Sequence, residues 1–291
     1  MVYSTHPQTR KKIEGEIFSY SLWENRLPSL REQYQKAEPF PHVVIDEFLQ
    51  LDTAEMALRE FPDLDSEDWI HYLHANEQKF GKTNLTAFPP KLKAVVEELN
   101  SPNFVQFLSK LTGIERLFAD ESLEGGGLHQ TAPGGFLNTH ADFTVHPHHR
   151  NWQRQINILI YLNQNWKDEY GGHLELWDQK MSRCVHKIAP IFNRSVIFNT
   201  TKDAFHGHPE PLKCPSGNTR KSIALYYFTE EKKSILIRST EYRARPGDGL
   251  KGLCIFLDKW ALRIYDQIKR WTGIDDRFAS NLLKFLNRKR K

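Results

Sequence analysis

Short apolar stretches recur through the middle of the chain and give the clearest structural signal. They begin after Gly125-Gly126-Gly127, and Gly, Pro, Asn and Asp residues separate them. Short strands at such regular spacing are typical of a double-sheet jelly roll or a barrel. The expected strands span residues 128–131, 136–141, 155–163, 173–178, 185–188, 195–200, 205–209 and 222–229.

Helical patterns precede this β-rich core. Residues 1–36 are polar with scattered aromatic side chains, which favours a helix or an extended arm. A short strand is expected at residues 42–45, a helix around 51–61, a loop over 62–90 and a helix at 91–100. Ser101-Pro102 predicts the start of another helix, because serine caps helices and proline fits the first helical position. Gly113 is expected to end that helix.

A helical period returns after the core. From Leu253 to Trp271, apolar residues form one stripe, and a second short helix is expected over residues 278–286. We therefore predict an α+β chain with a mainly-β core, a double-stranded β-helix (jelly roll) with flanking helices at both ends. The predicted parts are an N-terminal helical segment with an early strand (1–125), the jelly-roll core (126–231) and a C-terminal helical extension (232–291).

The amino-acid composition excludes several classes of protein but does not indicate a function. The 291 residues carry a net charge of +4, which is too small to suggest a nucleic-acid partner. Three cysteines without a C-x-x-C pattern argue against a disulfide scaffold or a cysteine-based zinc site. No apolar leader or membrane span is visible, so a cytoplasmic location is expected. Histidine is distributed unevenly, because nine of the 13 lie between His129 and His208.

Two of these histidines suggest a metal site. His140 and Asp142 lie two residues apart on an expected strand, so both side chains would point to the same face. His206, on a late strand, would complete a set of two histidines and one carboxylate. That set leaves one side of an octahedral metal open and is diagnostic of non-haem Fe(II) oxygenases. It also suits catalytic zinc, so a zinc hydrolase is an alternative.

Residues 127–230 resemble the prolyl 4-hydroxylase-like branch of the 2-oxoglutarate, Fe(II)-dependent dioxygenases. The region around residues 39–49 also resembles the opening strand of that family. The segments that carry the resemblance follow one another in the family's order. They are GFLNTHAD at 135–142, ILIYLN at 158–163 followed by Trp166, GGHLEL at 171–176, SVIF at 195–198, FHG at 205–207 and RKSIALYYF at 220–228.

The resemblance implies a role for several residues. His140, Asp142 and His206 would be the iron ligands. Arg220, or failing it Lys221, would bind the distal carboxylate of 2-oxoglutarate, for which a guanidinium offers a two-pronged fork. The hydroxyl group of Tyr161 would bind the same carboxylate.

Three further residues are expected to contact a ligand at this site. Gln130, or its neighbour His129, stands near the position of a family tyrosine that contacts 2-oxoglutarate. His208 lies two residues after His206, so it is either an alternative ligand or a substrate-side residue. Asn138 is expected to help orient the substrate.

The implied function is an Fe(II)- and 2-oxoglutarate-dependent dioxygenase. It would hydroxylate a C–H bond of a prolyl residue, a free amino acid or another small molecule, and release succinate and CO2. Fe(II), 2-oxoglutarate and O2 would be required, with ascorbate as a possible supporting reductant. A jelly-roll binding module without turnover is the alternative from another class. The C-terminal helix and its basic tail would pack against the roll or, in the second interpretation, contact a membrane surface.

Overall fold

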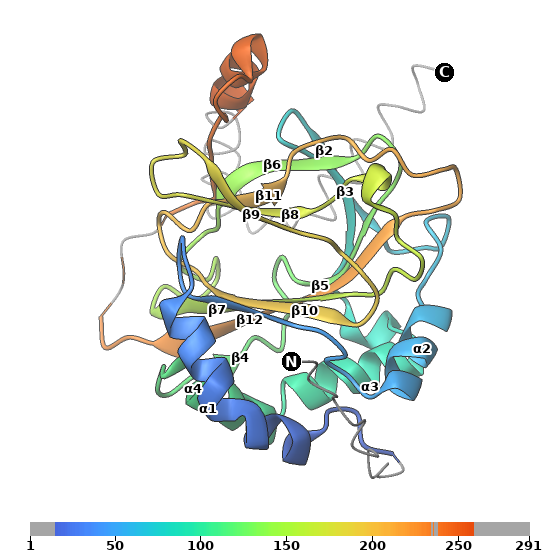
Figure 1. Cartoon of the computed structure of the whole chain (residues 1–291), viewed down its shortest axis with the longest axis vertical. Coiled ribbons are helices and arrows are strands. Elements are labelled where there is room, and N and C mark those ends of the chain that lie inside the picture. Colours follow the sequence, from blue (N-terminus) through green and yellow to red (C-terminus); the bar gives the residue numbers. More distant parts are fainter. Residues whose placement is uncertain (1–14, 234, 236–237, 259–291) are drawn as a thin grey trace, which may run out of the picture.

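A sheet of thirteen strands curls over on itself and forms the core of the molecule (Figure 1). The computed structural model describes residues 15–233, 235 and 238–258. Neighbouring strands along the main path run in the order β1-β10-β7-β12-β5-β3-β6-β11-β8-β9. All the strand pairs are antiparallel, and this topology is the predicted jelly roll with flanking helices. The strands are β1 His42–Ile45, β2 Ile70–His74, β3 Glu77–Lys82, β4 Phe118–Ala119, β5 Gly127–Thr131, β6 Phe136–Ala141, β7 Trp152–Tyr161, β8 Leu174–Trp177, β9 Cys184–Ile188, β10 Arg194–Asn199, β11 His206–His208, β12 Arg220–Glu230 and β13 Glu241–Tyr242.

The helices of the N-terminal segment cover one side of this sheet. Figure 1 shows them beneath β7, β10 and β12, on the side away from β6, β8 and β11. Their apolar side chains merge with those of the strands into one large buried cluster. The helices are α1 Tyr20–Lys36, α2 Leu51–Arg59, α3 Pro90–Leu99 and α4 Pro102–Thr112, with short 3₁₀ turns at Leu85–Ala87 and Asp168–Tyr170.

Helix α4 shows how local sequence sets these boundaries. The hydroxyl oxygen of Ser101 accepts a hydrogen bond from the backbone N–H of Phe104 at 3.3 Å, and Pro102 begins the helix. Gly113 ends it in the left-handed conformation, with φ at 77°. The side chains of Phe104 and Phe107 are then buried in the core beneath β12. The capping prediction for this helix is confirmed.

The longest strands, β7 and β12, separate two environments. Ile156, Ile158 and Ile160 alternate along β7 and pack into the helix-covered core. The residues between them point to the other side, into the fold of the sheet. On β12, Ile223 and Leu225 likewise join the helix-covered core, so Arg220 and Tyr226 share the opposite face. We call this second side the inner face of the sheet.

The hairpin of β2 and β3 differs from the loop expected over residues 62–90. Its second strand lies between β5 and β6 and joins the two halves of the roll. Phe80 pairs with Gln130 of β5, whereas Glu77 pairs with Leu137 of β6. The N-terminal segment thus contributes this hairpin to the sheet, in addition to β1 and β4, and does not only cover the roll.

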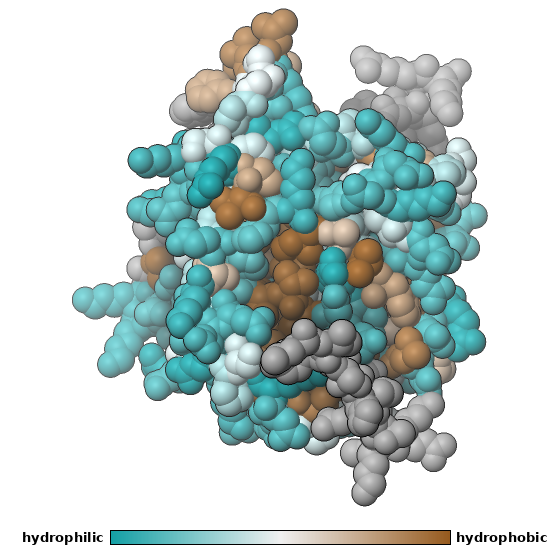
Figure 2. Space-filling model, in the orientation of Figure 1, coloured by the Kyte–Doolittle hydropathy of each residue, from teal (hydrophilic) through white to brown (hydrophobic). Residues whose placement is uncertain are grey.

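The C-terminal segment crosses back over the roll before it turns helical. Strand β13 pairs with β6, opposite Ala141 and His140. Residues 249–258 form a helix that projects from the body of the protein (Figure 1), and Figure 2 shows hydrophobic residues of this helix at the top of the view. The stripe predicted beyond residue 258 and the second helix at 278–286 lie outside the described residues. Among the residues that the structure describes, no helix has the length and apolarity needed to cross a membrane.

Candidate metal centre

His140, Asp142 and His206 meet at one point on the inner face. His140 comes from β6, Asp142 follows that strand directly, and His206 begins β11, where it pairs with His140. The Nε2 atom of His140 lies 3.5 Å from Asp142 Oδ1, and that of His206 lies 3.4 Å from Asp142 Oδ2. One ligand atom from each residue falls within a sphere small enough for a single ion, since all lie within 4.8 Å of one another.

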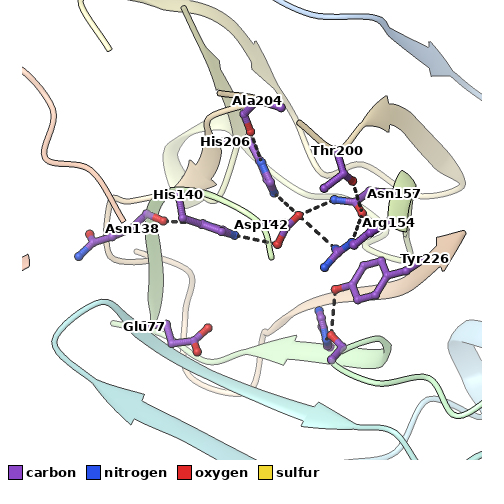
Figure 3. Close-up of polar contacts among 12 residues, drawn as sticks. Glu77, Asn138, His140, Asp142, Arg154, Asn157, Thr200, Ala204, His206 and Tyr226 are labelled. Carbon is purple, nitrogen blue, oxygen red and sulfur yellow. Dashed lines mark hydrogen bonds and ion pairs between the residues drawn. The ribbon is translucent and has the colours of Figure 1, made fainter. Parts of the chain in front are cut away.

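Backbone carbonyl groups orient both imidazole rings (Figure 3). The Nδ1–H of His140 donates to the carbonyl oxygen of Asn138 at 2.8 Å, and that of His206 donates to Ala204 at 2.9 Å. This tautomer leaves the Nε2 lone pairs of both rings available toward Asp142. Metal-binding histidines are typically held in this way, with the second ring nitrogen donating to a carbonyl or carboxylate. The donor set therefore fits a divalent metal ion.

Asp142 is held as a carboxylate. Its Oδ2 atom accepts hydrogen bonds from Asn157 Nδ2 at 2.6 Å and Arg154 Nη2 at 3.1 Å. Burial favours the protonated form, but Arg154 and the two imidazoles outweigh it and hold the pKa of Asp142 well below its usual value. Burial lowers the pKa of His206 to about 4, so that imidazole is neutral at physiological pH. Both residues are thus in the protonation state that a metal requires.

Comparison with protein families places this centre in a known context. Residues 126–228 match the model of the 2OG-Fe(II) oxygenase superfamily. These residues are a 2OG-Fe(II) oxygenase domain. Enzymes of this superfamily use Fe(II), 2-oxoglutarate and O2, as the resemblance implied. A search of curated proteins found no match to the chain.

Solved structures of prolyl hydroxylases are similar to this chain. One from Trichoplax adhaerens, in complex with a hypoxia-inducible-factor peptide fragment, has a TM-score of 0.54 and 18% identity, over 72% of this chain and 93% of its own. That similarity shows the shared fold. A prolyl 4-hydroxylase from Pseudomonas putida has a TM-score of 0.49 and 16% identity, over 70% and 100% of the two chains. A prolyl 4-hydroxylase structure from Phytophthora capsici has a TM-score of 0.49 and 21% identity, over 91% of this chain and 79% of its own.

Arg220 and Tyr161 lie together on the inner face of the sheet. The Nη2 of Arg220 donates to the Tyr161 hydroxyl oxygen at 3.2 Å, and its Nε donates to the carbonyl oxygen of Gly172 at 2.8 Å. Both side chains are buried. Gly172 has φ at +72°, and a Cβ there would approach Arg220 Cδ at 3.0 Å and Leu212 at 2.7 Å. A glycine is therefore required where the arginine passes, which explains part of the GGHLEL motif.

His208 lies near Arg220 and the metal-ligand set. Its Nδ1 atom is buried, and no described residue accepts or donates a hydrogen bond there. Burial and the nearby Arg220 and Lys79 side chains hold the pKa of His208 well below its usual value, so its ring is neutral. His206 is the histidine that meets His140 and Asp142. His208 is therefore available to a bound molecule.

Gln130 is not brought to the inner face. It pairs with Lys221 of β12 and Phe80 of β3, and Phe80 packs against the helix-covered core. Cross-strand pairs share a face, so all three point away from the metal centre. The Nε2 of Gln130 donates to Thr219 instead. Its neighbour His129, the alternative candidate, occupies the inner face because strand positions alternate.

Asn138 is also directed away from the centre (Figure 3). Its Nδ2 donates to the carbonyl oxygen of Ala75 and to Asn76 Oδ1, both in the turn between β2 and β3. The side chain therefore fastens the hairpin and does not face a substrate. Its contribution to the centre is the backbone carbonyl that orients His140.

The sequence did not reveal Arg154, although it contacts the carboxylate ligand. Simple alternation along β7 puts residue 154 on the same side as Ile156 and Ile158. A bulge lies between these positions: Tyr227 pairs with Ile156, but the next residue, Phe228, pairs with Arg154. The extra residue reverses the alternation and turns Arg154 inward. Its guanidinium then stacks on the Tyr226 ring, 3.4 Å from the ring centroid.

Proposed function

We propose that this oxygenase hydroxylates a C–H bond of an organic substrate and converts 2-oxoglutarate and O2 to succinate and CO2. One oxygen atom of O2 would enter the new hydroxyl group and the other would enter succinate. The observation that carries the proposal is the combination of the His140–Asp142–His206 set with the Arg220–Tyr161 pair on the same face of the sheet.

Bound Fe(II), together with 2-oxoglutarate, would supply the oxidising chemistry. The residues of the chain would supply position and charge. His140, Asp142 and His206 would hold the ion and leave one side of it open. Arg220 would bind the distal carboxylate of 2-oxoglutarate through its guanidinium, and the Tyr161 hydroxyl group would donate to the same carboxylate. Because these groups are buried, the ion pair would form away from bulk water, where it is stronger.

Two features of the site separate this proposal from the alternatives: the buried Arg220 and the carbonyl groups that orient both imidazoles. A zinc hydrolase needs only three ligands and an activated water molecule, and gives this buried arginine no task. A binding module without turnover gives no reason for two backbone carbonyls to orient both imidazoles. Substrate classes still compatible with the proposal are a prolyl residue, a free amino acid and another small molecule.

The test is an assay of 2-oxoglutarate turnover by protein purified anaerobically and loaded with Fe(II). We expect iron-dependent succinate formation, and His140→Ala is expected to abolish it. A product heavier by one oxygen atom, found by mass spectrometry of a substrate panel, would identify the hydroxylation. Turnover that is equal with and without iron, or unchanged in His140→Ala, would refute the proposal.

A further inference from the structure

An ion pair on β3 lies beside the metal centre and has no task in the proposed function so far. Lys79 Nζ lies 3.2 Å from Glu77 Oε2, and the two side chains are only 14% and 11% exposed. Removing two charges from water costs free energy that their mutual attraction often fails to recover. A buried pair of this kind is therefore better explained by a role in binding than by stability.

The register of β3 places the pair on the inner face. Glu77 lies opposite Leu137 on the strand that carries His140, and Gly81 lies opposite His129. Glu77, Lys79 and Gly81 are alternate residues, so they share the face that His129 occupies. In Figure 3 the Glu77 carboxylate lies below His140, on the side of the centre away from Ala204.

Groups behind Glu77 hold its carboxylate in place. His74 Nε2 lies 3.0 Å from Glu77 Oε1, and His74 Nδ1 lies 2.9 Å from Asp258 of the C-terminal helix. Burial opposes the charge of Glu77, but Lys79 and His74 outweigh it and keep its pKa well below the usual value. Lys79 likewise remains an ammonium: burial, the largest single effect, lowers its pKa, but Glu77, Tyr226 and Asp142 together raise it above the usual value. Both members of the pair are thus charged and fixed.

The charges on the inner face do not balance. Among the described residues, Lys79, Arg154 and Arg220 are cations on this face, whereas Glu77 and Asp142 are the anions. Burial and Lys79 lower the pKa of His129 to about 3, so this ring adds no charge. Fe(II) and the dianion of 2-oxoglutarate would cancel one another. One positive charge therefore remains on this face, and it favours a carboxylate group on the part of the substrate that lies next to it.

Of the three cations, Lys79 is the one that can still bind a carboxylate of the substrate. Arg154 is committed to Asp142 and Asn157, and Arg220 is assigned to 2-oxoglutarate. Glu77 occupies one direction of the Lys79 ammonium, which has three N–H donors. We propose that Lys79 binds a carboxylate of the substrate, with Glu77 as its positioning residue, so that the substrate is a small free carboxylic acid such as an amino acid. This inference rests on the proposed function.

The test compares acids with their amides. Under anaerobic conditions, protein loaded with Fe(II) and 2-oxoglutarate is titrated by calorimetry with the free L-amino acids. Each amino acid that binds is then compared with its primary amide. We expect the wild-type protein to bind the acid at least about tenfold more tightly, since a hydrogen bond between charged groups is worth this much. Lys79→Met should remove most of that preference, whereas Lys79→Arg should keep much of it.

Lys187→Met is the control, because Lys187 also pairs with a buried glutamate, Glu175, 3.1 Å away on the neighbouring strands β9 and β8, although the Lys187 side chain itself is exposed. It should leave the preference for the acid unchanged. Circular dichroism of each variant checks that it is folded. Equal binding of acid and amide by the wild-type protein, or binding of only a prolyl peptide blocked at both ends, would overturn the inference even if 2-oxoglutarate turnover is normal. Absent turnover would instead refute the proposed function, and calorimetry would still report on Lys79.

Discussion

The two faces of β7 and β12 differ although the same strands form both. On the helix-covered face, Ile158 and Ile223 are completely buried among other apolar side chains. On the inner face, Asn157, Arg220 and Tyr226 make polar contacts instead. The first face gains stability from apolar burial, which needs no particular geometry. The second face fixes the orientation of its polar side chains, because every buried polar group needs a hydrogen-bond partner.

This difference separates folding from chemistry within one sheet. A substitution on the helix-covered face should weaken the fold and leave ligand binding by the folded protein intact. A substitution on the inner face should weaken ligand binding and leave the stability of the fold largely unchanged. Each prediction below tests that separation, beginning with the largest effect.

His140→Ala should have the largest effect of any single inner-face change. It removes one of three ligands, so affinity for Fe(II) should fall by more than the roughly 10–100-fold that loss of an outer partner costs. Anaerobic calorimetry with Fe(II) measures this directly. His173→Ala is the control, since His173 also pairs with an aspartate, Asp168 at 2.8 Å, but lies away from the centre. Equal affinities in the two variants would contradict the assignment of the site.

Ile158→Ala should instead lower stability. The side chain is fully buried on the helix-covered face, and loss of such a group costs about 2–5 kcal/mol of unfolding free energy. Ile158→Val should cost only about 0.5–1.5 kcal/mol. Chemical denaturation followed by fluorescence measures both values. Affinity of the folded protein for Fe(II) should stay at the wild-type level, and a large loss of affinity would break the separation between the faces.

The apolar pattern predicted the helix-covered face well and the inner face only in part. Short runs with turn residues between them located the core strands, and Ser101 with Gly113 bounded α4 correctly. The hairpin of β2 and β3 was missed because burial does not alternate simply along either strand. These strands are recognisable only from their partners on β5 and β6.

The polar residues of the inner face could be predicted only where they belong to a recognisable sequence motif. His140 and Asp142 share a face through simple alternation, and the His-Gly pair at 206–207 indicated the third position. Arg154 was missed because a bulge reverses the alternation of β7. Gln130 and His129 stayed alternatives because they are neighbours on one strand, and a shift of the alignment by one residue moves a side chain to the other face. Sequence alone does not fix the register at that precision.

Arg154→Met should weaken metal binding without removing a ligand. Methionine keeps an apolar side chain against the Tyr226 and Phe143 rings but loses the hydrogen bond to Asp142. Affinity for Fe(II) should fall by roughly 10–100-fold. The pKa of Asp142 should also rise toward its ordinary value, so protons should displace the metal at a higher pH than in the wild-type protein. Calorimetry across a pH series measures both effects.

Arg154→Lys is the matched variant, because it keeps a positive charge next to Asp142. It should recover part of the affinity and most of the wild-type pH profile. If Arg154→Met binds Fe(II) as tightly as the wild-type protein at every pH, the guanidinium has no part in preparing the carboxylate. The inner face would then depend on its three ligands alone.

The smallest expected effect is a pH dependence of the unfolding free energy that arises from His74. His74 lies between Glu77 of β3 and Asp258 of the C-terminal helix, with the Tyr242 ring nearby. Burial lowers its pKa, but the two carboxylates outweigh burial and raise it above the usual value. This stabilisation is complete below about pH 6.5, the ordinary histidine pKa, and is lost as the pH rises through the pKa of His74 in the folded protein.

The unfolding free energy measured from pH 6 to 9 should therefore fall less steeply in His74→Gln than in the wild-type protein. Ile158→Ala changes no titratable group, so it should lower the whole curve without altering its slope, and a changed slope would show that the two faces are coupled.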